Sequence, residues 1–224
     1  MSKINLHYST ITKKIVMSLL GVFLMMFLLV HLIINLLYFA DDNGRLFNIA
    51  AHFMQTNIFI KIFEVVLFGG FIIHIILGLI LQIQNWLARP KRYKVYCHSQ
   101  KSYFSKYMIH TAVIILVFLT IHLLNFYLKV KFFGSVDEVI YDGKTYHDLS
   151  SLMYSLFHIA GYVIFYIIAF IILGFHLNHA FQSAFQSLGL NHSVYTPYIK
   201  AIGLLFSIII PLGFTIIPIL IYFS

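Results

Sequence analysis

Four histidines stand within long apolar stretches of the sequence, where a metal-ligating side chain is unusual: His31, His74, His122 and His176. A neutral imidazole is a common metal ligand, and haem iron is often bound by histidine. Inside a bilayer an imidazole cannot hydrogen-bond to lipid, so each ring needs a partner within the protein. One inward-facing histidine on each of four packed helices would supply the ligands of two bis-histidine haems.

The positions of these histidines along the expected helices predict two pairs. His31 lies in the segment FLLVHLIIN, and His122 lies 91 residues later in the similar segment FLTIHLLN. Both are about 24–27 Å of helix from the basic residues at one membrane edge, while His74 and His176 are about 20–22 Å from that edge. The spacing permits the pairs His31/His122 and His74/His176. The alternative is that each imidazole only hydrogen-bonds a neighbouring helix.

The remaining histidines are assigned more ordinary roles. His179 shares a helix face with His176 and is its main rival as a ligand. His110 and His158 are expected to be interfacial or packing residues, with a redox or quinone role as the alternative. Five others fall in loops or at membrane edges and are expected to be solvated: His7, His52, His98, His147 and His192.

Three further polar residues are candidates for a quinone site. Glu64 is the only acid expected to enter a membrane span, and intramembrane carboxylates often mark proton paths. Its alternative is a place in the headgroup layer, paired with Lys61 three residues earlier. Asn35 and Asn125 could hydrogen-bond a quinone carbonyl or a haem propionate, or only a neighbouring backbone.

The composition defines the class of protein. Of the 224 residues, 61% are hydrophobic and only 10% are charged, against about 25% charged in a soluble domain. We therefore expect an all-α integral membrane protein in which residues 1–224 form one domain. The single cysteine, Cys97, excludes an internal disulfide and a four-thiolate iron–sulfur cluster. Any haem would be held without thioether bonds, because no C-x-x-C-H motif is present.

Five apolar runs predict five transmembrane helices, at about 15–39, 58–87, 107–128, 150–187 and 198–222, with the first four forming the haem-binding bundle. The first run is longer than a signal peptide and lacks its cleavage site, so we expect it to be retained. The connections are expected to be a polar segment with an interfacial helical turn (41–57), a basic loop (89–106), a polar loop (129–149) and a turn (189–196). Pro211 and Pro218 are expected to kink the fifth helix.

The charges predict the orientation in the membrane. Ten Lys and Arg residues and no acid fall on the side of the N-terminus, while five basic residues and all seven acids fall on the other. The positive-inside rule then places the N-terminus in the cytoplasm and the C-terminus in the periplasm. The net charge of +8 thus reflects topology, and no nucleic-acid partner is expected.

Several stretches, which together extend over nearly the whole chain, resemble a known family: KKIVMSLLGVFLMMFLLVHL, FNIAAHFMQTN, GFIIHIILGLILQIQN, FLTIHLLNF and GFHLNHAFQSAFQSLGLNHSVYTP. They are similar to the single-subunit, five-helix, di-haem cytochrome b anchors of bacterial succinate:menaquinone oxidoreductases and fumarate reductases. This is the b558 type, and the chain is particularly similar to its Bacteroidetes form. In HLNHAFQS, the ligand of that family is followed four residues later by a small and then a bulky residue. Ala180 and Phe181 fit that pattern and favour His176 over His179.

The resemblance implies two b haems stacked across the bacterial inner membrane, the distal one held by His31 and His122 and the proximal one by His74 and His176. It implies two cytoplasmic partners, a flavoprotein with covalent FAD that carries the dicarboxylate chemistry and an iron–sulfur subunit. Electrons would pass between that subunit and menaquinone, linking the tricarboxylic acid cycle to the respiratory chain. Dimerisation of the complex and the direction of the reaction are left open. Some fumarate-reducing members carry a glutamate where this chain has Gly174, so the resemblance does not extend to their proton path.

Two other classes of function are compatible with the residues. One is the cytochrome b anchor of a different quinone-linked dehydrogenase, of the hydrogenase or formate dehydrogenase type. The other is a transporter that uses the histidines for a metal ion or a proton. Scarcity of intramembrane carboxylates argues against the transporter.

Overall fold

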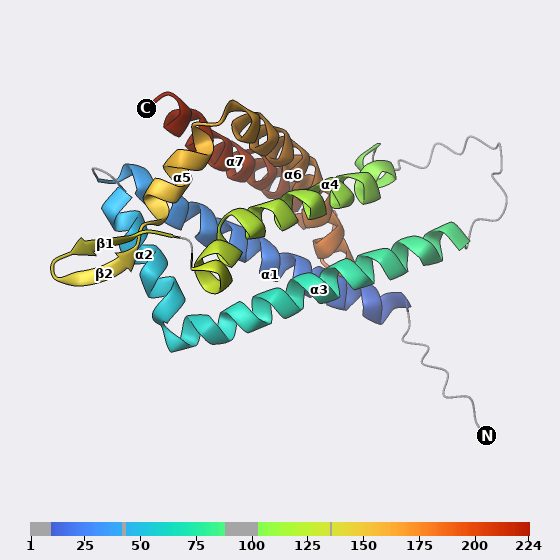
Figure 1. Cartoon of the computed structure of the whole chain (residues 1–224). Helices are drawn as coiled ribbons and strands as arrows, with labels where there is room; N and C mark the ends of the chain where they lie inside the picture. The colour runs from blue at the N-terminus through green and yellow to red at the C-terminus, as the bar shows by residue number, and fades with distance from the viewer. Residues whose placement is uncertain (1–9, 42–43, 88–102, 135) are drawn as a thin grey trace, which may run out of the picture.

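The computed structural model describes residues 10–41, 44–87, 103–134 and 136–224 (Figure 1). Within these ranges, five helices are long and apolar enough to cross a membrane, which confirms an all-α integral membrane protein. Expectations for the N-terminal lead, for most of the basic loop 89–106 and for His7, Cys97 and His98 lie outside the described residues.

The crossing helices are α1 (Thr10–Leu36), α3 (Ile58–Leu87), α4 (Tyr103–Asn125), α6 (Ala160–Ser187) and α7 (Tyr195–Tyr222). A 3-10 turn, η1 (Leu37–Phe39), extends α1, and a π-helical turn, η3 (Lys129–Phe133), follows α4. Pro211 and Pro218 lie inside α7, which is continuous. The helix begins earlier than expected because Pro197 occupies its first turn, where no backbone N–H is needed for the helical ladder.

The expected single helix at 150–187 is wrong. The chain forms a short helix, α5 (Leu149–Phe157), and then α6, with Ile159 in an extended conformation (φ −95°, ψ 107°) between them. No proline marks this break in the sequence, and its glycine, Gly161, falls only after α6 has begun. Asp148 fixes the start of α5 by accepting a hydrogen bond from the Ser151 backbone N–H (3.1 Å), and α5 then packs on α2, α6 and α7.

The connections outside the crossings are more ordered than expected. The polar segment after α1 contains a full helix, α2 (Arg45–Thr56), and the polar loop after η3 contains an antiparallel hairpin, β1 (Glu138–Tyr141) and β2 (Lys144–His147). Asp142 and Gly143 both have positive φ (51° and 75°), as a two-residue hairpin turn of type I′ requires. The hairpin lies beside α2 at one end of the molecule (Figure 1).

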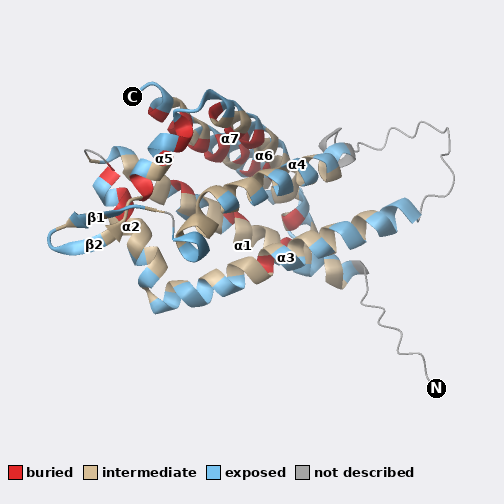
Figure 2. Cartoon of the chain, viewed as in Figure 1, coloured by how far each residue is buried: buried red, intermediate tan, exposed pale blue. Residues whose placement is uncertain are grey.

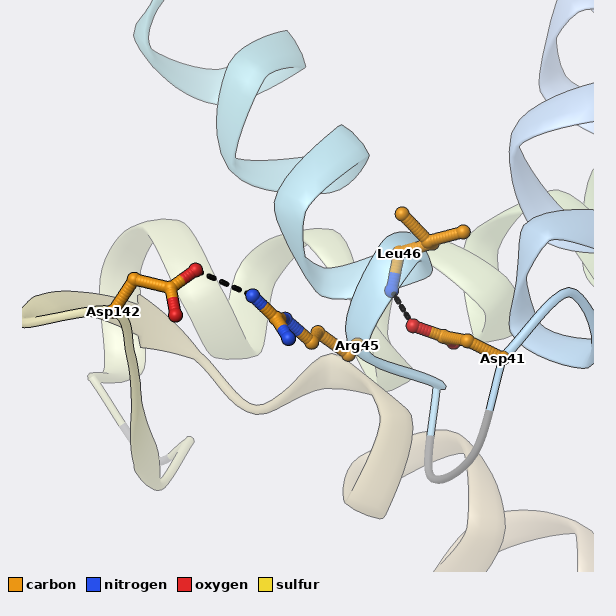
Figure 3. Close-up of polar contacts among 4 residues, drawn as sticks. All are labelled: Asp41, Arg45, Leu46 and Asp142. Carbon is orange, nitrogen blue, oxygen red and sulfur yellow. Dashed lines mark hydrogen bonds and ion pairs between the residues drawn. The ribbon is translucent and has the colours of Figure 1, made fainter.

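Polar contacts join these extramembrane elements. Arg45 at the start of α2 pairs with Asp142 in the hairpin turn, and the Leu46 backbone N–H donates to Asp41 Oδ2 at 2.9 Å (Figure 3). Asn48, only 1% exposed, donates to Tyr141 and Asp148 and accepts the Ser150 N–H at 2.9 Å. Helix α2, the hairpin and α5 are thereby held as one cap.

The core lies mainly between α1, α6 and α7, where the buried residues gather (Figure 2). Glycines allow close approach here: a Cβ on Gly174 of α6 would lie 2.9 Å from the Ser207 carbonyl oxygen of α7, and one on Gly213 would lie 2.7 Å from Leu32 of α1. Such small-residue contacts drive helix association in lipid, where no hydrophobic effect acts between helices. By contrast, α3 buries only Gly70 among its residues, and α4 packs chiefly on α6.

Candidate metal-binding histidines

One pair of histidines, His31 and His122, meets edge-on between α1 and α4. The ring centroids of His31 and His122 are 5.8 Å apart, and their planes are nearly perpendicular, at 86°. A metal–imidazole bond of about 2 Å on each side would place two rings about 6 Å apart. The structure therefore brings together the two residues predicted as the first pair, at a separation that suits a shared metal.

The surroundings of this pair are aromatic and apolar. Phe27 stacks on His31 and Phe118 stacks on His122, each from one turn earlier on the same helix, with centroids 5.2 and 5.7 Å apart. Phe214 of α7 covers His31 at 5.7 Å. Such a shell excludes water, and burial of this kind is one of the means by which proteins tune a bound metal.

Polar groups contact both rings of the first pair. The Tyr166 hydroxyl of α6 is 3.5 Å from His122 Nδ1, and Tyr166 itself is only 2% exposed. Asn35 donates to the His31 backbone oxygen at 2.8 Å, and its amide nitrogen is 3.5 Å from His31 Nε2. Asn125, three residues after His122, has a buried Nδ2 with no hydrogen-bond partner in the described chain.

The second pair, His74 of α3 and His176 of α6, lies at a different level. His176 is close enough to His74 of α3, and to His179 on its own helix, for the three rings to interact electrostatically. Its Nδ1 is 3.4 Å from the Thr111 hydroxyl of α4. His74 Nδ1 is buried and has no hydrogen-bond partner among the described residues, and a Cβ on Gly21 of α1 would lie 3.9 Å from its Cε1.

The distance between the two histidine levels is nearly the same when it is counted along α1, α4 or α6. On each of three helices, one residue lies at the level of each pair. These residues are Gly21 and His31 on α1, 10 residues apart, Thr111 and His122 on α4, 11 apart, and Tyr166 and His176 on α6, 10 apart. At 1.5 Å per residue each interval corresponds to about 15–16 Å. The contacts at each level therefore share one register of the bundle, but the two levels lie farther apart than the few ångströms that the distances from the membrane edge predicted.

These residues fit a haem better than a bare metal ion. Each level offers two imidazoles and no charged ligand, which suits an iron whose other ligands come from a porphyrin. A structural zinc site needs four ligands and a catalytic one three, and no group of three or more His, Cys, Asp or Glu side chains gathers in the described ranges. The Nδ1 of His74, which has no hydrogen-bond partner among the described residues, and the small Gly21 beside the ring are also compatible with a flat macrocycle at this level.

Glu64 forms a separate polar cluster near the other end of α3, ten residues from His74. Tyr127 donates its hydroxyl proton to Glu64, Lys131 Nζ lies 2.7 Å from the carboxylate, and the Phe68 ring lies 4.9 Å from the Tyr127 ring. The alternative in which Glu64 pairs with Lys61 is not observed, because the ion pair is formed with Lys131 of the π-helical turn. Sequence spacing shows only partners on the same helix, so it could not reveal this contact between elements.

The other histidines mostly occupy unremarkable positions. His158 is exposed at the α5–α6 break, with Nδ1 2.9 Å from the Tyr154 carbonyl oxygen, and His110 is exposed beside Tyr107. His147 differs from expectation: it is half-buried, and its Nδ1 is buried with no hydrogen-bond partner in the described part of the chain. Its strand is covered by α2, which the sequence did not predict at full length.

Sequence reasoning missed two hydroxyl residues, Thr111 and Tyr166. Threonine and tyrosine are common in membrane helices, so neither is informative by type alone. The usable signal is their position, since each lies 10–11 residues from a histidine on its own helix and therefore at the level of the other pair.

Comparison with protein-family models, with curated proteins and with solved structures gave no match to this chain.

Proposed function

We propose that this chain is the membrane-anchor cytochrome b of a succinate dehydrogenase or fumarate reductase complex. It would carry electrons between an iron–sulfur subunit and menaquinone through two b haems, one held by His31 and His122 and the other by His74 and His176. The observation that carries the proposal is the His31–His122 pair, whose perpendicular rings lie 5.8 Å apart, centroid to centroid, within an aromatic shell.

The chain's own residues would bind and insulate the prosthetic groups. When bound, haem iron supplies reversible one-electron chemistry at a potential set by its ligands and surroundings. The four histidines would provide ligand nitrogens at two levels about 15 Å apart. Phe27, Phe118 and Phe214 would keep water from the first level, and Gly21 would leave room beside His74 at the second.

The distribution of basic residues predicts the face of the membrane on which the partner subunits would dock. A flavoprotein with FAD and an iron–sulfur protein would dock on the cytoplasmic face of the bacterial inner membrane, where the chain carries its excess of basic residues. Dicarboxylate chemistry would take place on the flavoprotein. This chain would provide the electron path and the quinone site.

We place the quinone site near Glu64 on the opposite side of the membrane. The carboxylate there is joined to Tyr127 and Lys131, so it could exchange protons with a quinone and relay them through the tyrosine. Asn35 and Asn125 are the nearest candidates on α1 and α4 for hydrogen bonds to a quinone carbonyl. The buried, partnerless Nδ2 of Asn125 supports that role.

The direct test is to purify the complex and record its reduced-minus-oxidised spectrum and haem stoichiometry. We expect a b-type spectrum with two haems per chain. Replacing His31 or His122 with alanine should remove one haem and spare the other, and replacing His74 or His176 should remove the second. His179→Ala, a change on the same face of α6 as His176, is the matched control and should retain both.

Other results would favour the other classes of function. Bound zinc or copper without haem would indicate a transporter. Two haems together with hydrogenase or formate dehydrogenase activity in the co-purified partners would indicate a different quinone-linked enzyme. Loss of both haems, or of neither, in the His31 variant would contradict the pairing.

The quinone assignment has its own test. Glu64→Gln should lower menaquinol-dependent turnover at least tenfold while both haems remain reducible, because the amide cannot take up a proton; general acid–base groups contribute about 10²–10⁴-fold. Glu138→Gln, which changes an exposed acid of the hairpin, is the control. Unchanged turnover in Glu64→Gln would remove Glu64 from the site.

A further inference from the structure

Helices α4 and α6 each present a hydroxyl to a histidine of the other helix. Thr111 of α4 lies 3.4 Å from Nδ1 of His176 on α6, and Tyr166 of α6 lies 3.5 Å from Nδ1 of His122 on α4. The two helices pack along each other, and the 11- and 10-residue intervals place both contacts in one register. The arrangement is therefore reciprocal, with one contact at each histidine level.

The hydrogen bonds of Thr111 fix the direction of the first contact. Its single hydroxyl proton is donated to the Met108 carbonyl oxygen at 2.8 Å. Towards His176 the oxygen can then only accept, so Nδ1 must carry the ring's hydrogen. In that tautomer the lone pair is on Nε2, the nitrogen directed away from Thr111.

Tyr166 is suited to the same task at His122. Its ring is fixed among Phe118, Phe157 and Phe170, with centroids 5.1–5.9 Å away. A side chain held in this way offers its hydroxyl oxygen at a defined position. When the oxygen accepts from Nδ1–H, the lone pair of His122 is on Nε2, as in His176.

The remaining histidine of each pair has no such contact. His74 Nδ1 has no hydrogen-bond partner in the described residues. The polar group found beside the His31 ring in the described part of the chain is the Asn35 amide, at 3.5 Å from Nε2. Each pair thus combines one ring that a hydroxyl orients with one that no hydroxyl contacts in the described structure.

We propose that Thr111 and Tyr166 are positioning residues, each of which sets the tautomer and the donor strength of one iron-ligating histidine on the opposite helix. This inference rests on the function proposed above. A hydrogen bond from the non-ligating ring nitrogen makes a histidine a stronger donor, and its removal typically weakens metal binding 10–100-fold. A stronger donor stabilises ferric over ferrous iron, so each hydroxyl lowers the reduction potential of its own haem.

The test is a potentiometric titration of the purified complex, with low-spin electron paramagnetic resonance spectra of both haems. Tyr166→Phe should raise the potential of the His31/His122 haem and leave the other unchanged, and Thr111→Val should do the reverse. A tenfold loss of ferric preference corresponds to about 59 mV for one electron. Thr111→Ser, which keeps the hydroxyl, should restore the wild-type potential.

Two matched controls remove hydroxyls that do not contact these rings. Thr120→Val deletes a hydroxyl on α4 that bonds the Leu116 carbonyl oxygen of its own helix, and Tyr162→Phe deletes one a turn before Tyr166. Neither should move a potential. Selective loss of only the matching haem from a variant would also support the inference.

The outcomes separate this inference from the proposed function. A wild-type complex without b haem would overturn both. A wild-type complex with two haems whose potentials do not move in Tyr166→Phe and Thr111→Val would overturn only the positioning role. Loss of both haems from either variant would also contradict the positioning role, because each hydroxyl would then affect the haem at the other histidine level as well.

Discussion

We expect the stability of the extramembrane cap to depend on pH through the carboxyl group of Asp148. Burial tends to raise the pKa of its carboxyl, but hydrogen bonds from Ser151, Ser150 and Asn48 outweigh burial and lower the pKa below its usual 3.8. The ionised form is therefore favoured by folding. Its contribution to stability is complete above the unfolded pKa and is lost as the pH falls through the lower folded value.

We expect Asp148→Asn to keep the N-cap of α5 at neutral pH, because asparagine caps helices about as well as aspartate. The wild-type chain should lose thermal stability more steeply than the variant as the pH falls from about 5 to 3. Melting curves in detergent across this range would measure the difference, with Glu138→Gln as the control. Parallel curves would show that the carboxylate does not stabilise the cap. Asp148→Ala should cost about 0.5–2 kcal/mol even at neutral pH.

At the residue scale, the four histidines could be predicted because a titratable ring among apolar residues is conspicuous. Their hydroxyl partners could not be, since Thr111 and Tyr166 are recognisable only once α4 and α6 are in register. The same reason explains Glu64, whose partners are Tyr127, just after α4, and Lys131 of the π-helical turn. Composition revealed the candidates, and tertiary packing decided their contacts.

At the scale of elements, the contact between α6 and α7 depends on Gly174. A methyl group there would lie 2.9 Å from the Ser207 carbonyl oxygen, which is backbone and cannot move aside cheaply. Any side chain at position 174 would therefore clash with α7.

We expect Gly174→Ala to destabilise the protein by about 1–3 kcal/mol through overpacking. Gly161→Ala is the matched control on the same helix, where a Cβ would meet no atom within 4 Å; it should be neutral or stabilise by up to about 1 kcal/mol. Thermal unfolding in detergent compares the two. Equal melting temperatures would show that α6 and α7 can move apart enough to accommodate a methyl group at position 174 without loss of stability.

The extent of the elements was predictable where hydrophobicity alone decides it. The spans at 58–87 and 198–222 are close to α3 and α7, because long apolar runs have few alternatives in lipid. The α5–α6 break was not predictable, since the apolar pattern continues through His158 and Ile159. The hairpin was missed although Asp142-Gly143 is a typical turn pair, because the surrounding residues do not alternate clearly.

At the scale of the whole molecule, five membrane-spanning helices place the start of α1 and the C-terminus at opposite ends (Figure 1). The cap of α2, the hairpin and α5 lies at the end that also holds the C-terminus. In the orientation that the charge asymmetry predicts, this end would face the periplasm.

We expect single cysteines to report this orientation once Cys97 is replaced by serine. Thr145→Cys in the exposed hairpin should react with a membrane-impermeant maleimide in intact spheroplasts. Lys200→Cys, near the start of α7, should react only after permeabilisation. Both residues are exposed, so an inverted pattern would reverse the assigned topology rather than reflect burial.

The crossed arrangement of Thr111 with His176 and Tyr166 with His122 also bears on how such a chain could evolve. Each hydroxyl belongs to one level only, so a single substitution could retune one electron carrier while the driving force at the other stayed fixed. Related chains should then vary at positions 111 and 166 independently of each other, in step with the redox partners and quinones that each lineage uses.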